Sequence, residues 1–284
     1  MPSKILTEQL QKDVINFYKS KPMSHLEVAN KFNLCCITVS KILKAHNILP
    51  YKKAQIFNTN MNEHFFENID SEEKAYLLGL LITDGNIFKN DNRQASISIC
   101  LNDFDMIEKI KNLWQVNTSI VNDHRRAGAY CIAIRSDIIA NDLKQYGVVP
   151  NKTLYTYLPQ NIKPELMKDL IRGIMDGDGS IQFKKSKLGK RINCISFCGT
   201  HQLMNEIAEF LYNTLNLYTK PKTYDYKDKN LSQICFQRLE DIIKIGDYLY
   251  NNATIFLNRK KESYIQIKNV YIEKEYNTSK SVRP

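Results

Sequence analysis

Tyr76–Ile87 reads YLLGLLITDGNI, and Leu170–Ile181 reads LIRGIMDGDGSI. Each stretch is an apolar run at helical spacing that ends in Asp-Gly, and a Gly just past the last periodic residue is the usual helix stop. One such run would carry little information, because buried helices often end at a turn of this kind. Two copies in matched context indicate an internal duplication.

The similarity continues downstream of the two Asp-Gly pairs, which are 178 − 84 = 94 residues apart. Ile97–Cys100 (ISIC) matches Ile195–Cys198 (ISFC) at an offset of 98, and Cys131–Ile139 matches Cys235–Ile243 at an offset of 104. Loop insertions between duplicated halves produce offsets that drift in this way. Each half is therefore predicted to contain a helix, two strands, a helix, two strands and a helix.

The repeats resemble the LAGLIDADG family of homing endonucleases over about residues 70–275. Aligned with the nonapeptide of that family, Leu77–Gly85 reads LLGLLITDG and Ile171–Gly179 reads IRGIMDGDG; the first copy has Ile82 where the family often has Asp. The resemblance implies an α+β fold of two αββαββα halves related by a pseudo-twofold axis. It also implies a monomer that cuts both strands of a long, non-palindromic double-stranded DNA site.

Small residues lie four positions apart in each motif and so share one helix face. Such residues allow two helix backbones to approach closely, and the predicted packing positions are Gly79, Thr83, Gly173 and Gly177.

The C-terminal ends of two such helices would bring Asp84 and Asp178 together. Helix C-termini are electronegative and two carboxylates repel each other, so a divalent cation would stabilise the pair. The resemblance implies that these two aspartates are the catalytic metal ligands. Oxygen ligands without nearby His or Cys favour Mg²⁺, or Mn²⁺, over Zn²⁺.

The resembled family also has a basic residue near each site that stabilises charge on the phosphorane. The matching positions are Lys152, in VVPNKT, and Lys260, in IFLNRKK. Each lysine is expected to open the third helix of its half and to act catalytically as a point charge. The alternative is that both are ordinary surface lysines.

Alternation in the strands predicts a polar sheet face, because Ile97 and Ile99 point away from Ser96 and Ser98. Polar, uncharged side chains suit base edges in the major groove, and basic hairpin residues reach phosphates. A solvated sheet face is the other interpretation. The predicted DNA contacts of the two halves are Arg93, Gln94, Ser96, Ser98, Arg125, Arg126, Lys184, Lys185, Lys187, Lys190, Arg191, Ser196, Gln233 and Gln237.

The N-terminal segment, residues 8–49, is predicted to form three short helices. Ser24–Phe32 and Ile37–His46 are the second and the third. Ser24 followed by Glu27 three positions later is a capping box at the start of the second helix.

The turn between these helices resembles the helix-turn-helix family. Ala29 is a small residue where the helices touch, Asn33 tolerates the positive φ of the turn, and Val39 packs into the core. That family places its third helix in the major groove, whereas a plain helical hairpin is the alternative. The predicted DNA contacts of the third helix are Thr38, Ser40, Lys41 and Lys44.

The composition agrees with a polyanionic partner. The 284 residues carry 40 Lys and Arg against 30 Asp and Glu, a net charge of +10, although ordinary solubility charge would give the same balance. The seven cysteines form no CxxC pair and are expected to be buried, reduced thiols. Without a signal sequence or an apolar run of membrane-spanning length, a soluble intracellular protein with no membrane partner is expected.

The expected organisation is a helix-turn-helix domain at residues 1–49, a linker at 50–70, halves at 71–161 and 162–275, and a flexible tail at 276–284. Two other functions remain open on the same fold. One is a DNA-binding regulator without cleavage activity, and the other is an RNA maturase that binds intron RNA. Retention of both aspartates favours the endonuclease over the regulator.

Overall fold

The computed structural model describes residues 7–51, 61–91, 93–123, 128–185, 191–226 and 230–281. The chain divides into two compact units. The smaller unit comprises Met1–Asn62 with Trp114–Ser119, and the larger comprises Glu63–Leu113 with Ile120–Pro284. Within the described ranges, no helix combines the length and apolar character needed to cross a membrane.

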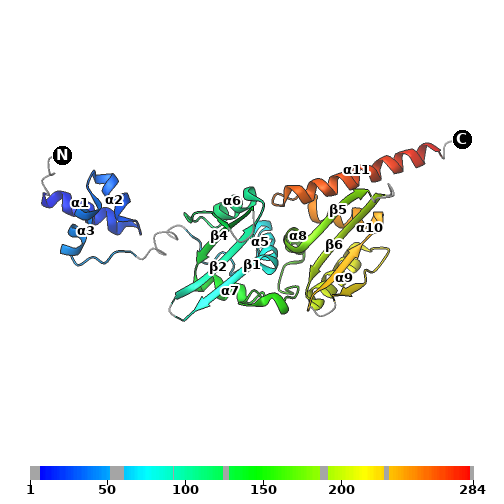
Figure 1. Cartoon of the computed structure of the whole chain (residues 1–284), viewed down its shortest axis with the longest axis horizontal. Coiled ribbons are helices and arrows are strands. Elements are labelled where there is room, and N and C mark those ends of the chain that lie inside the picture. The colour runs from blue at the N-terminus through cyan, green and yellow to red at the C-terminus, as the bar shows by residue number, and fades with distance from the viewer. Residues whose placement is uncertain are drawn as a thin grey trace. The chain divides into compact units, whose positions relative to one another are not determined.

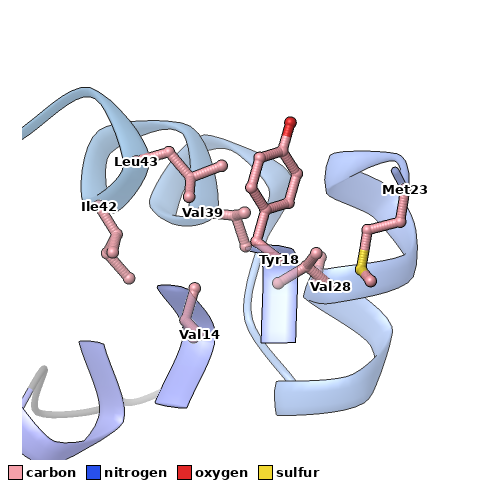
Figure 2. Packing of buried hydrophobic residues seen from close by; sticks show 8 residues of the cluster. Val14, Tyr18, Met23, Val28, Val39, Ile42 and Leu43 are labelled. Atoms are coloured by element: carbon pink, nitrogen blue, oxygen red, sulfur yellow. The ribbon is translucent and has the colours of Figure 1, made fainter. Parts of the chain in front are cut away.

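The described residues of the smaller unit form three helices, α1 (Glu8–Ser20), α2 (His25–Phe32) and α3 (Cys36–Ala45) (Figure 1). Its core gathers side chains from all three helices, and Figure 2 shows Val14, Tyr18, Met23, Val28, Val39, Ile42 and Leu43 packed together. Three short helices bury only a small apolar core, so hydrogen bonds at the helix ends are important for their stability.

Capping fixes both ends of α2. The Ser24 hydroxyl accepts a hydrogen bond from the Glu27 backbone N–H at 3.2 Å, and the Glu27 carboxylate accepts one from the Ser24 backbone at 2.7 Å. The capping box that the sequence predicts is therefore present. Asn33 ends the helix in the left-handed region, with φ 51°, as the turn requires.

The larger unit repeats one arrangement twice, first as α5 (Glu72–Thr83), β1 (Gly85–Asn90), β2 (Arg93–Leu101), α6 (Phe104–Leu113), β3 (Val121–Asp123), β4 (Ala129–Arg135) and α7 (Asp137–Lys144). The second copy is α8 (Met167–Asp178), β5 (Gly179–Lys185), β6 (Arg191–Gly199), α9 (His201–Leu215), β7 (Thr223–Asp225), β8 (Ser232–Phe236) and α10 (Leu239–Tyr250), followed by α11 (Asn258–Ser281). The α+β fold with two αββαββα halves is confirmed.

Both halves form four-stranded antiparallel sheets in the same strand order, β1-β2-β4-β3 and β5-β6-β8-β7. The apolar strand face of the first sheet packs against α6 and α7, and that of the second against α9 and α10. Figure 1 shows α5 and α8 side by side between the two sheets. The two motif helices therefore form the core of the interface between the halves.

The sheet register corrects one part of the repeat alignment. Ile132 lies opposite Ile99 in the first sheet, and Ile234 lies opposite Phe197 in the second. The structural offset is therefore 234 − 132 = 102 rather than 104. The similarity of Cys131 to Cys235 misled the alignment, because the two cysteines occupy positions two residues apart in the ladder.

The expectation of seven buried, reduced cysteines holds for Cys194, which is buried and free, and in part for the half-buried free thiols of Cys198 and Cys235. It is wrong for the other four cysteines. Cys100 and Cys131 lie directly opposite each other on β2 and β4 and form a disulfide. Cys35 and Cys36 are exposed at the start of α3. Direct cross-strand neighbours bring their side chains together, which a count of cysteine spacing does not reveal.

Two predicted boundaries also differ from the structure. The linker was expected to extend to residue 70, but Phe65, Phe66 and Ile69 are buried and belong to the larger unit. The flexible tail was expected to begin at residue 276, whereas α11 continues to Ser281. Residues 52–60 of the expected linker lie outside the described ranges.

Candidate active site

Backbone contact between α5 and α8 sets the geometry of the site. A Cβ atom on Gly79 would lie 2.2 Å from the Leu170 carbonyl oxygen and 2.8 Å from the Gly173 Cα. A Cβ atom on Gly177 would lie 2.0 Å from the Thr83 Oγ1. Larger side chains at these glycine positions would hold α5 and α8 apart. The small residues therefore allow the C-terminal ends of the two helices to lie close together.

Asp84 and Asp178 stand at these two ends. Asp84 caps α5, Asp178 is the last residue of α8, and the glycine after each begins a strand. A Cβ atom on Gly177 would lie 3.2 Å from Asp84 Oδ2, so the end of α8 leaves room for the carboxylate of α5. Both aspartates line one open cavity of about 650 Å³, together with Thr83, Gly85, Asn86, Ser98, Cys100, Asp123, Lys152 and Thr153.

The two lysines occupy equivalent places beside these helix ends. The Lys152 ammonium donates to the carbonyls of Thr83, at 3.2 Å, and Gly85, at 2.6 Å. The Lys260 ammonium lies 3.4 Å from the Gly177 carbonyl and 2.8 Å from that of Gly179. These carbonyl pairs are 177 − 83 = 94 and 179 − 85 = 94 residues apart, so the motif alignment extends to the lysines.

Neither lysine opens the third helix of its half, which corrects the sequence-based expectation. Lys152 begins a single 3-10 turn after α7, and Lys260 lies in the first turn of α11, after α10. Both side chains are buried, with 7% and 5% exposure, and they are not surface lysines. The segment after α7 brings Lys152 to the C-terminal end of α5, and the segment after α10 brings Lys260 to the C-terminal end of α8. Each ammonium group there compensates the partial negative charge of the helix terminus.

Charge couples the four side chains. Although Asp178 reaches the surface, the protein packed around it raises the pKa of its carboxyl group, and Lys152 and Lys260 lower it. Burial lowers the pKa of Lys152, against the opposing charges of Asp178 and Asp84. Burial also lowers the pKa of Lys260 to about 8, with Asp176 as the largest opposing charge.

The donors around the two aspartates suit a hard divalent cation. Asp84 and Asp178 offer carboxylate oxygens, and the Cys100 sulfur at the same cavity is bonded to Cys131. Mg²⁺ is commonly held by one or two carboxylates, with water and substrate phosphates completing its octahedral shell. The room that Gly177 leaves beside Asp84 is consistent with this assignment.

The polar face of the first sheet is open, but that of the second is partly closed. Arg93 and Gln94 are exposed, and Ser96 and Ser98 are half-buried on the face opposite Ile97 and Ile99. In the second sheet Lys184 and Gln237 are exposed and Gln233 is half-buried.

Ser196 is only 3% exposed and is not accessible to a base edge, which corrects its assignment as a DNA contact. It lies on the central strand β6, between Ser180 on β5 and Cys235 on β8. Among the other expected contacts, Arg125, Arg126, Lys187 and Lys190 lie outside the described residues, as do the side chains of Lys185 and Arg191.

The sequence-based prediction missed five residues of this cavity: Gly85, Asn86, Cys100, Asp123 and Thr153. Asn86 is exposed two positions after Asp84, and Thr153 is exposed directly after Lys152. Asn86 alternates with buried Ile87, and this period of two was a usable signal for its direction. Thr153 gave no signal, because its 3-10 turn has no periodicity.

In the smaller unit, the predicted contact residues share the outer face of α3. Ser40, Lys41 and Lys44 are exposed, whereas the core side of the same helix buries Val39 and Ile42. Thr38 is half-buried, and its hydroxyl lies 3.0 Å from the Cys35 sulfur. Three of the four side chains are therefore free of the core and point to solvent.

Comparison with solved structures places this geometry in a known fold. A complex of meganuclease I-SmaMI with uncleavable DNA aligns with a TM-score of 0.51 and 13% identity, covering 72% of this chain and 92% of that chain. I-SmaMI bound to an uncleaved DNA target in the presence of calcium ions gives a TM-score of 0.51 at 13% identity, with 74% and 93% covered. A mutant of I-SmaMI with two lysines replaced by alanine gives 0.50 at 13% identity, with 72% and 92% covered.

No protein-family model matches the sequence, and a search of curated proteins found no match. I-SmaMI is described as a LAGLIDADG homing endonuclease. The chain therefore has the α+β fold of the LAGLIDADG homing endonucleases, with two four-stranded antiparallel sheets and additional N-terminal helices.

Proposed function

We propose that the chain is a site-specific endonuclease that hydrolyses both strands of double-stranded DNA. The observation that carries the proposal is a duplicated site at the C-terminal ends of α5 and α8. Each helix end has one aspartate and one buried lysine, and the two copies match at the same offset of 94 residues in α5 and α8. Two equivalent sets of catalytic groups match a substrate with two equivalent bonds, such as one phosphodiester in each strand of double-stranded DNA. A single chain supplies both halves, so the active species is a monomer on a long, non-palindromic site.

Asp84 and Asp178 would hold the divalent metal, Mg²⁺ or Mn²⁺. When bound, such a metal lowers the pKa of the attacking water and stabilises the attacking and leaving oxygens. Lys152 and Lys260 hold positive charge at fixed positions beside the two carboxylates. A preoriented charge of this kind stabilises the negative charge that develops on a phosphate during hydrolysis.

The sheets and the N-terminal helices would bind the DNA. Half-buried and exposed polar residues on the first sheet face the same side as the cavity residue Ser98, which suits contacts with base edges. The outer face of α3, with Lys41 and Lys44, would act as a helix-turn-helix reader of flanking sequence. The net charge of +10 supports attraction to the phosphate backbone.

Selection of cleaved molecules from a random double-stranded DNA library tests the proposal. The purified chain is incubated with the library in Mg²⁺, and a parallel sample contains Ca²⁺ to retain bound, uncut DNA. The expected result is one long asymmetric sequence that is cut on both strands only in Mg²⁺. Binding without cutting in either metal would contradict the endonuclease and favour the regulator. Binding of structured RNA in place of DNA would favour the maturase.

A further inference from the structure

A buried carboxylate anchors the chain segment that carries Lys260. Asp176 is 1% exposed, and its side chain accepts a hydrogen bond from the Leu257 backbone N–H at 2.7 Å. It also accepts one from the Tyr76 hydroxyl and one from the Tyr250 hydroxyl, each at 2.8 Å. Leu257 directly precedes α11, so Asp176 holds the start of the helix that contains Lys260.

The main chain of Asp176 reaches the lysine itself. The Lys260 ammonium donates to the Asp176 carbonyl at 2.6 Å and to the Met175 carbonyl at 2.5 Å. One residue of α8 therefore binds the segment at two points, through its side chain at Leu257 and through its carbonyl at Lys260.

A second polar pair, buried Arg172 and half-buried Glu72, holds the same segment two to three residues before Leu257. Arg172 is 1% exposed and donates to the Ile255 carbonyl at 2.9 Å. Glu72 accepts hydrogen bonds from the backbone N–H groups of Thr254, at 2.7 Å, and Ile255, at 3.3 Å, and pairs with Arg172 at 2.6 Å. The connection from α10 to α11 is thus tied to both motif helices by ionic and polar groups.

The residues that the pseudo-twofold axis relates to Asp176, Arg172 and Glu72 are all apolar. With the motif offset of 94, Asp176 corresponds to Ile82, Arg172 to Leu78, and Glu72 to Leu166. Ile82 and Leu78 are buried. Among the described residues, these positions therefore carry the polar network beside Lys260 but not beside Lys152.

We propose that Asp176 is a positioning residue for Lys260 and that it acts on cleavage of only one of the two DNA strands. This inference rests on the proposed function. Loss of the Leu257 hydrogen bond frees the first turn of α11 to move, and displacement of a catalytic group by about 1 Å can cost a hundredfold in rate. The Lys152 ammonium donates to the carbonyls of Thr83 and Gly85, which do not belong to this network, so Lys152 is expected to keep its position.

Two variants separate positioning from general loosening of the core. Asp176→Leu keeps a side chain of similar size but has no acceptor, so it removes all three hydrogen bonds, including that of the Leu257 N–H. Tyr76→Phe is the matched control, because it removes one hydrogen bond to Asp176 and leaves the Leu257 contact in place.

The first measurement does not depend on catalysis. Reductive methylation with formaldehyde, followed by mass spectrometry of each lysine, compares the reactivity of Lys260 with that of Lys152 in the full chain. Asp176→Leu is expected to raise the ratio of Lys260 to Lys152 reactivity by about tenfold, and Tyr76→Phe by about twofold at most. An unchanged ratio, or an equal rise at both lysines, would overturn the positioning role.

The second measurement follows nicked and linear products on a plasmid that carries the selected DNA site. Asp176→Leu is expected to slow cleavage of one strand by about tenfold or more, so that nicked circles accumulate with a single labelled strand cut. Equal slowing of both strands would overturn the one-strand role. If the unmodified chain cuts no selected site, the proposed function fails and the one-strand role with it, while the lysine reactivities still decide whether Asp176 positions Lys260.

Discussion

Gly79→Ala adds one methyl group at the closest approach of α5 and α8. Carbon atoms in contact usually lie about 3.5 Å apart, whereas this methyl would lie 2.2 Å from the Leu170 carbonyl oxygen and 2.8 Å from the Gly173 Cα. The third near atom is the Ile174 backbone nitrogen at 2.8 Å, and because all three are backbone atoms, no side chain can rotate away. The helices must separate by on the order of 1 Å.

The expected change in the free energy of unfolding is the difference of two effects. Overpacking of this kind typically costs about 1–3 kcal/mol, while Ala in place of Gly gains up to about 1 kcal/mol of helix propensity. A net loss of about 1–2 kcal/mol corresponds to a fall in Tm of about 2–8 °C for a unit of this size. Cleavage should fall further, because the same movement separates Asp84 from Asp178.

Differential scanning calorimetry with a matched control measures this effect. In Gly199→Ala the new methyl would meet only flexible side-chain ends, the Met204 Cε at 3.0 Å and the Leu203 Cδ2 at 3.3 Å, so Tm should change by less than about 2 °C. A rise in Tm for Gly79→Ala would mean that helix propensity dominates. That result would refute backbone contact between the motif helices.

Three further predictions follow from the same geometry. Lys152→Ala should slow one DNA strand by at least about a hundredfold, seen as nicked plasmid, and equal loss on both strands would contradict two separate sites. Lys41→Ala combined with Lys44→Ala should reduce the slope of log K against log salt by about two; an unchanged slope would place α3 away from phosphate. Iodoacetamide at pH 7.5 should label exposed Cys35, whose pKa is lowered by a hydrogen bond, well before Cys194, whose pKa burial raises to about 11. Equal labelling rates in peptide mass spectra would contradict this burial.

The sequence was sufficient for the features that depend on local pattern. The glycine spacing around Gly79 and Gly173 predicted the helix contact, and the repeated Asp-Gly pairs predicted the ends where Asp84 and Asp178 meet. Alternation along Ile97 and its neighbours predicted the open and covered faces of the first sheet. Periods of 3.6 and 2 carry this information within ten residues.

Features that depend on distant contacts were not predictable from the sequence. Glu72 and Arg172 have the composition of a solvated helix surface, yet they meet across 100 residues and hold the segment before α11. The sequence assigns Asp176 to the motif but predicts no separate role for it, because nothing near it in the sequence indicates Leu257 as its hydrogen-bond partner. The pairing of Cys100 with Cys131 likewise follows from strand register, which local pattern fixes only to within a residue or two.

The central claim is that Asp84 and Asp178 bind the metal that cleaves DNA. Asp84→Asn and Asp178→Asn retain nearly the same shape, so they remove charge without changing the helix packing. Binding of the selected DNA site in Ca²⁺ and double-strand cleavage in Mg²⁺ should be measured on the same preparations. The account predicts that each variant binds within about threefold of the unmodified chain and that double-strand cleavage falls by at least about a thousandfold. Full double-strand cleavage by either variant in Mg²⁺ would contradict it.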